Sequence, residues 1–184
     1  MQNLLLLSGS LRDDSVNTKL LKAFADAVAD TVSVAWGSAD LPLYNEDLEA
    51  TSFPEAAQKL RAQVLAADVV VLSTPEYNRG MSGVLKNAID WVSRPGGENA
   101  WSNKTLILAS ASPGSLGGAV AQYQLVQTMH HLGAVIPPGL EFILGHAYEK
   151  FDQYGTLTDM ITKERIVAAL QRTGIATKDE MSLS

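Results

Sequence analysis

Residues 4–21, with the sequence LLLLSGSLRDDSVNTKLL, constrain the fold more than any other segment. The run from Leu4 to Leu7 is typical of a short strand buried on both faces, as in a parallel sheet covered by helices on both sides. The small residues at positions 8–10 predict a tight turn, and Ser15 is a suitable N-cap for a helix. The apolar stripe expected on that helix consists of Val16, Leu20, Phe24 and Val28. A buried strand therefore leads directly into a helix N-terminus.

The turn after this strand is a candidate phosphate site. The first N–H groups of a helix lack intrahelical acceptors, and the aligned peptide dipoles place partial positive charge there. Arg12 and Asn17 would add side-chain donors. The segment has neither the glycine spacing of the dinucleotide fingerprint nor the lysine and second glycine of a P-loop. A hydroxyl-rich loop with one arginine suits a phosphate monoester, such as that of flavin mononucleotide (FMN). The alternative is a capped helix with a surface arginine.

Composition narrows the possible functions. The 184 residues are enough for one domain, which we expect to span residues 1–184. No apolar run approaches the roughly 18 residues that cross a bilayer, and the leucine run lacks the flanks of a signal peptide. We therefore expect a cytoplasmic protein without a membrane partner. A net charge of −6 argues against binding to nucleic acid. The chain has no cysteine, so any electron transfer requires a bound cofactor.

The rest of the chain alternates predicted strands and helices. Strands are expected at residues 31–35, 69–72, 104–109 and 141–144. Helices are expected at residues 83–91, 119–131 and 161–171, together with one that begins at Pro54 and turns Ala57, Leu60, Val64 and Leu65 inward. This alternation predicts an α/β fold with right-handed crossovers and a parallel sheet. An ordered loop is expected at residues 41–48.

Three polar loops follow the first, third and fourth predicted strands, with the sequences SGSLR, TPEYN and SASPGSLGG. In parallel α/β sheets, ligands bind beyond the carboxyl ends of the strands, so we expect the three loops to meet. Tyr77 could lie against a planar ring, and backbone amides from Glu76 onward could meet the polar edge of a heterocycle. The glycines of the third loop would let its backbone approach closely. The alternative is that these loops are merely rich in turn residues.

Four segments in this order and spacing, GSLRDDSVN, LPLYNEDLE, TPEYNRGMSGVLKNAIDW and SASPGSLGG, resemble the NADPH-dependent FMN reductase family. The resemblance covers roughly residues 4–131. It implies a flavodoxin-like three-layer sandwich with a five-stranded parallel sheet of order 2-1-3-4-5. It also implies reduction of a small-molecule acceptor, namely a quinone, an azo compound, a metal oxyanion or free flavin. NADPH or NADH would supply the hydride, and the protein would be a homodimer or homotetramer.

The resemblance also implies which residues bind the cofactor. The FMN phosphate would be held by Ser10, Arg12, Ser15 and Asn17. The isoalloxazine ring would lie against Pro75, Glu76, Tyr77 and Asn78, largely through their main chain, with Ser112 and Gly114 on the remaining side. No side chain need act as a catalytic acid or base. No metal site is expected, since the side chains of His130 and His131 diverge on a helix.

Some residues depart from the family pattern or have other expected roles. Val120 and Val126 stand where arginine is frequent, which leaves the choice between NADPH and NADH open. A flavin-binding electron carrier or redox sensor with slow nicotinamide oxidation is therefore a second hypothesis. An α/β binding domain without flavin is a third. The side chains of Asp13 and Asp14 are expected to face solvent. We expect core or interface positions for Trp91, Trp101 and Tyr123.

Overall fold

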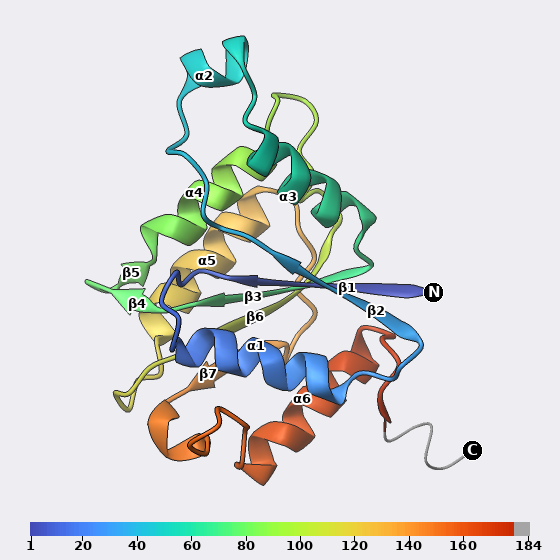
Figure 1. Cartoon of the computed structure of the whole chain (residues 1–184), viewed down its shortest axis with the longest axis vertical. Coiled ribbons are helices and arrows are strands. Elements are labelled where there is room, and N and C mark those ends of the chain that lie inside the picture. Colours follow the sequence, from blue (N-terminus) through green and yellow to red (C-terminus); the bar gives the residue numbers. More distant parts are fainter. Residues whose placement is uncertain (179–184) are drawn as a thin grey trace.

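The structure, a computed structural model, describes residues 1–178 and is built on one five-stranded sheet (Figure 1). Its strands are β1 (Gln2–Ser8), β2 (Val32–Gly37), β3 (Val69–Thr74), β6 (Thr105–Ala111) and β7 (Glu141–Leu144). They lie in the order β2-β1-β3-β6-β7, and all neighbours pair in parallel. Numbered by strand of this sheet, the order is 2-1-3-4-5, so the predicted flavodoxin-like topology is confirmed. The predicted domain end at residue 184 lies outside the described residues.

Helices cover both faces of the sheet. They are α1 (Val16–Ala27), α2 (Glu46–Thr51), α3 (Glu55–Ala66), α4 (Gly83–Val92), α5 (Ala119–His131), the short 3-10 helix η1 (Ala147–Lys150) and α6 (Met160–Arg172). In Figure 1, α1 and α6 lie on one face, and α3, α4 and α5 lie on the other. No helix within residues 1–178 has the length and apolar character to cross a membrane.

The leucine run explains why the sheet is central. Leu4 and Leu6 point into the apolar core beneath α1 and α6, whereas Leu5 and Leu7 point into the core beneath α3, α4 and α5. All four side chains are buried. Since burying one leucine side chain contributes about 2 kcal/mol, this strand stabilises both layers at once. The prediction of a strand buried on both faces is therefore confirmed.

Most of the predicted elements are present, with a few corrections. Pro54 is the N-cap of α3 rather than its first helical residue, and Leu65 is 52% exposed because it follows the inward-facing Val64 by one position. The helix α2 falls at the end of the predicted loop and buries none of its residues. Trp91 and Trp101 are in the core as expected. Tyr123 is 62% exposed, so an interface position stays its prediction.

Asn17 connects α1 to the carboxyl ends of two strands. Its side chain is 2% exposed and reaches Ala111 of β6, where Oδ1 accepts from the backbone N–H (2.9 Å) and Nδ2 donates to the carbonyl (3.0 Å). The same Oδ1 accepts from the Ser73 hydroxyl of β3 (2.9 Å). One amide therefore satisfies both backbone groups of a residue at the end of a buried strand.

We expect Asn17→Ala to lower the free energy of unfolding by about 3 kcal/mol, because it leaves the buried N–H and C=O of Ala111 without these partners. Ser73→Ala, which removes a single hydroxyl, is the matched control and should cost about 1 kcal/mol. Urea unfolding at neutral pH measures both values. Equal stability of the two variants would contradict this role of Asn17.

Asp159 caps α6 and joins it to η1. Its Oδ2 accepts from the Thr162 backbone N–H (3.0 Å) and hydroxyl (2.6 Å), and its Oδ1 pairs with Lys150 Nζ (2.9 Å). The Thr162 hydroxyl, and after it Lys150, lowers the pKa of Asp159 from 3.8 to about 2. The carboxylate is therefore stabilised in its ionised form at the helix N-terminus.

Because the pKa of Asp159 is lowered on folding, its contribution to stability is present above its ordinary pKa and is lost as the pH falls toward its folded value. Asp159→Asn should therefore be less stable than the unmodified protein at neutral pH, and the difference should narrow from about pH 5 to about pH 3. Urea unfolding across this range measures it, with the exposed Asp30→Asn as control. A difference independent of pH would argue against an ionic role.

Candidate functional site

The first loop, residues 8–15, is fixed to the end of β3 and the start of α4. The Gly9 N–H donates to the Ser73 carbonyl (2.7 Å), and the Ser82 hydroxyl donates to the Gly9 carbonyl (2.6 Å). A Cβ atom added at Gly9 would lie 2.9 Å from both Ser82 Oγ and Leu85 Cβ. Position 9 therefore requires glycine, because a side chain would push the loop away from the strand end.

The first loop ends at the N-terminus of α1. As predicted, Ser15 is the N-cap, and its hydroxyl oxygen accepts from the Thr18 N–H (3.5 Å) while its own proton remains available to donate. The hydroxyl oxygen of Ser10 accepts from the Arg12 N–H (3.3 Å). Arg12 is exposed and makes no ion pair within residues 1–178. One short segment thus carries two serine hydroxyls, an exposed arginine and the first-turn N–H groups of α1, which are groups that can bind an anion.

The first loop carries two acidic residues, and one of them is paired with a lysine. Asp13 and Asp14 are both exposed, as expected. Asp14 pairs with Lys19, and the hydrogen bond and charge of Lys19 lower the pKa of the Asp14 carboxyl. The charge of Asp14 is therefore balanced by a lysine of α1.

The side chain of Asn17 is committed to Ser73 and Ala111, so it is not free to act as the side-chain donor suggested by the sequence. Position 17 stays a predicted phosphate contact through its backbone N–H, which belongs to the first turn of α1.

The second loop forms a small hairpin, β4 (Glu76–Tyr77) and β5 (Gly80–Met81), that the sequence did not predict. Its turn residues Asn78 and Arg79 both have positive φ, at 52° and 64°, which suits a two-residue hairpin turn. Pro75 is buried before the hairpin, whereas Tyr77 is 53% exposed. The hairpin therefore presents an aromatic ring and a sharp turn at the carboxyl edge of the sheet.

The carboxylate of Glu76 joins the second loop to α5. Its Oε2 accepts from the backbone N–H groups of Val120 (3.0 Å) and Ala121 (3.1 Å), and its Oε1 lies 3.4 Å from Arg79 Nη1. Gly118, the N-cap of α5, provides no side-chain cap. Glu76 supplies this cap from a distant segment, in contact with the positive end of the helix dipole. The sequence suggested a main-chain role for Glu76 and missed this contact.

The third loop, residues 112–118, is supported by the segment after β7. The Ser112 carbonyl accepts from the Ala147 N–H (3.1 Å), and the Gly114 carbonyl accepts from the His146 N–H (3.3 Å). A Cβ atom added at Gly145 would lie 2.4 Å from the Ser115 carbonyl oxygen, so the two backbones are in close contact. The sequence analysis did not predict this support, although Gly145, directly after β7, is a residue that could have indicated a close backbone approach.

The three loops therefore meet at one end of the sheet, as predicted. Bonds from Ser82 to Gly9, from Gly9 to Ser73 and from Glu76 to α5 connect each loop to its neighbours. The N-terminus of α1, the hairpin with its exposed Tyr77 and the glycine-rich third loop therefore belong to the same edge of the sheet. Within residues 1–178, no group of three or more histidine, aspartate or glutamate side chains could hold a metal ion.

The two valines that depart from the family pattern have different surroundings. Val120 is 39% exposed in the first turn of α5, beside Glu76. Val126 is partly buried and packs against the core beneath α3, α4 and α5. Of the two valines, Val120 is therefore the one in contact with a residue of the three loops.

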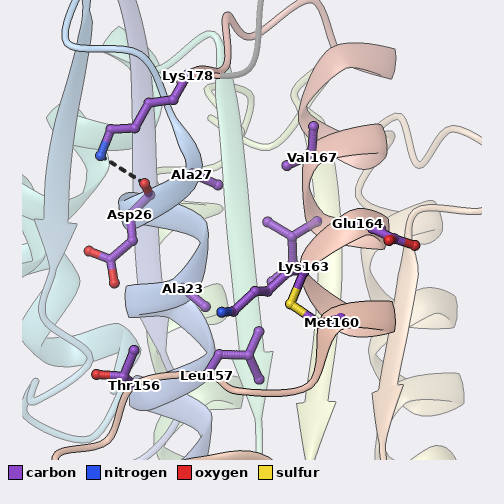
Figure 2. A pocket seen from close by; sticks show the side chains of 11 residues that line it. Ala23, Asp26, Ala27, Thr156, Leu157, Met160, Lys163, Glu164, Val167 and Lys178 are labelled. Carbon is purple, nitrogen blue, oxygen red and sulfur yellow. Dashed lines mark hydrogen bonds between the residues drawn. The ribbon is translucent and has the colours of Figure 1, made fainter. Parts of the chain in front are cut away.

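A groove of about 410 Å³ between α1 and α6 does not belong to this site (Figure 2). Its lining includes Ala23 and Ala27 from the C-terminal half of α1 and Met160 and Val167 from α6. The first loop lies at the opposite end of α1. A shallower hollow of about 330 Å³ does border the first loop, and its lining residues are Asp13, Ser15, Thr18, Lys19, Lys22 and Trp36.

Solved structures share this architecture. The flavoenzyme FerB of Paracoccus denitrificans, described as an NAD(P)H:(acceptor) oxidoreductase, superposes with a TM-score of 0.84 at 34% sequence identity and covers 94% of this chain and 95% of its own. A flavodoxin from the domain Archaea superposes with a TM-score of 0.55 at 10% identity, over 94% of this chain and 99% of its own. The second likeness supports the flavodoxin-like fold alone.

Sequence comparison identifies the family. An NAD(P)H-dependent FMN reductase of Pseudomonas aeruginosa is 42% identical over 166 residues, which is 90% of this chain and 89% of the relative. A quinone reductase of Pseudomonas putida is 40% identical over 152 residues, or 82% of each chain. The model of the NADPH-dependent FMN reductase family matches residues 2–149. The chain belongs to the NADPH-dependent FMN reductase family.

Proposed function

We propose that this protein is an FMN-dependent NAD(P)H reductase whose electron acceptor is a quinone. The observation that supports the proposal is the hydrogen-bonded junction of the three loops at one edge of the sheet, where an anion and a planar ring could bind side by side. Bound FMN would supply the redox chemistry, accepting a hydride from a reduced nicotinamide and passing electrons to the acceptor. The protein chain itself would bind the flavin, orient its ring and shield it from water.

The donor set of the first loop fits the phosphate end of FMN. We assign phosphate binding to Ser10, Arg12, Ser15 and the backbone N–H at Asn17. Gly9 supports this fit, because any Cβ atom there would collide with Ser82 and Leu85 and displace the loop. The free charge of Arg12 would offset that of a phosphate in a chain whose net charge is −6.

The second and third loops fit the ring end. We assign the ring platform to Pro75, Glu76, Tyr77 and Asn78, with Ser112 and Gly114 on the remaining side. Gly114 is open enough for close approach, since an added Cβ atom would meet only Ser112 Oγ at 3.8 Å. The Glu76 carboxylate is turned toward α5 and Arg79, so its charge is balanced away from the ring. Backbone donors rather than an acid or base would then stabilise charge on the ring.

Several finer features are part of the proposal. A quinone acceptor agrees with the printed names of relatives such as the Pseudomonas putida enzyme. The side chains of Tyr77, Val120 and Tyr123 are exposed near the site. A homodimer or homotetramer could bury them in its interface and cover the entrance to the site. Either NADPH or NADH could be the donor, and Val120 provides no positive charge that would select a nicotinamide phosphate. We propose a cytoplasmic location.

Anaerobic stopped-flow spectroscopy tests the function. The FMN-loaded protein should lose its flavin absorbance within seconds of mixing with NADPH or NADH, and a simple quinone such as benzoquinone should restore it. Bleaching over many minutes with both donors would contradict the reductase assignment and favour an electron carrier or redox sensor. A chain that binds no FMN would contradict both.

Arg12→Ala should weaken FMN binding by roughly 10-fold, because it removes a charge-assisted contact to the phosphate. Riboflavin, which lacks the phosphate, should bind the variant and the unmodified protein equally. Quenching of flavin fluorescence measures both dissociation constants. Lys59→Ala removes an equal charge from an exposed position of α3, on the other face of the sheet, and serves as control. Equal losses for FMN in the two variants would indicate a general charge effect and would count against Arg12 as a phosphate ligand.

A further inference from the structure

We propose that Gln124 of α5 is a positioning residue that holds the β4–β5 hairpin in its flavin-binding conformation. This inference rests on the proposed function, because the hairpin carries the residues assigned to the ring platform. Gln124 belongs to none of the motifs that the sequence analysis used, and it lies outside the three loops.

The hairpin is too small to hold its own shape. It has two residue pairs, Glu76 with Met81 and Tyr77 with Gly80, and it is not part of the main sheet. Isolated two-stranded hairpins are marginally stable in water even when they are longer. Its turn also places two residues other than glycine at positive φ, which is unfavourable without external support. Neighbouring elements must therefore fix its position.

Helix α5 provides this support at both strands of the hairpin. On β4, the Glu76 carboxylate accepts from the first-turn N–H groups of α5. On β5, the Met81 backbone N–H donates to Gln124 Oε1 at 2.8 Å. The first contact is made by the N-terminal end of the helix, and the second by a side chain of its second turn. Helix α5 therefore contacts both strands of the hairpin, β4 through its N-terminus and β5 through the Gln124 side chain.

The Gln124 side chain makes a close contact with the hairpin backbone. A Cβ atom added at Gly80 would lie 3.2 Å from Gln124 Oε1, so the amide lies directly against the hairpin backbone. Met81 is only 9% exposed, which limits the access of water to its N–H if Gln124 is removed. The next residue, Ser82, bonds to both Thr74 and Gly9. A shift at Met81 would thus reach the second and first loops.

The test compares Gln124→Ala with Gln124→Glu, which keeps an acceptor oxygen, and with Gln127→Ala, an exposed glutamine on the same helix. Gln124→Ala should weaken FMN and riboflavin by the same factor, roughly 3- to 10-fold, since the hairpin meets the ring and not the phosphate. It should also speed hydrogen exchange at the Met81 amide. Gln124→Glu should retain most of the affinity for both flavins, and Gln127→Ala should retain all of it.

Unchanged binding of both flavins by Gln124→Ala, or a loss confined to FMN, would overturn the inference. Unmodified protein that binds neither flavin would instead overturn the proposed function. Exchange at the Met81 amide, measured without flavin, would still decide whether Gln124 holds the hairpin.

Discussion

The candidate site depends on buried hydrogen bonds that join strand ends to loops at the carboxyl edge of the sheet. Parallel strands end with unpaired backbone groups, and here these groups bond to side chains and backbone groups of other segments. The Asn17 side chain bonds to the backbone of Ala111, and the Ser82 hydroxyl donates to the Gly9 carbonyl. The Gly9 N–H in turn donates to the Ser73 carbonyl. Each of these bonds joins segments far apart in the sequence. The three loops are therefore held together by the same contacts that complete the sheet.

Different helices and strand ends support different parts of the resulting site. Helix α1 places the positive end of its dipole at the first loop, which carries the exposed Arg12. The N-terminus of helix α5 bonds to Glu76 of β4, and a side chain of its second turn bonds to Met81 of β5. Both strands of the hairpin are therefore attached to the same helix. The segment after β7 supports the third loop through Gly145 and His146. Since each part rests on a helix or strand end, a flat cofactor would meet a surface that is already formed.

Much of this arrangement could be predicted from the sequence, because it follows from local pattern. Four leucines before a small-residue turn predict a buried strand, and Ser15 predicts the helix start. The parallel topology then brings the three loops to one edge. Side-chain partners could not be predicted in this way. The Asn17 side chain was expected to face a phosphate, but it bonds to the sheet. Residue spacing gives no indication that Glu76 caps α5 or that Gln124 bonds to the hairpin. Such contacts depend on tertiary placement.

A crystal structure of the FMN-loaded protein tests the central claim most directly. We predict that the phosphate lies within hydrogen-bonding distance of the first-turn N–H groups of α1 and of Arg12. The ring should lie between the β4–β5 hairpin and the third loop. FMN bound with its phosphate elsewhere, for example in the groove between α1 and α6, or with its ring away from the hairpin, would contradict the account.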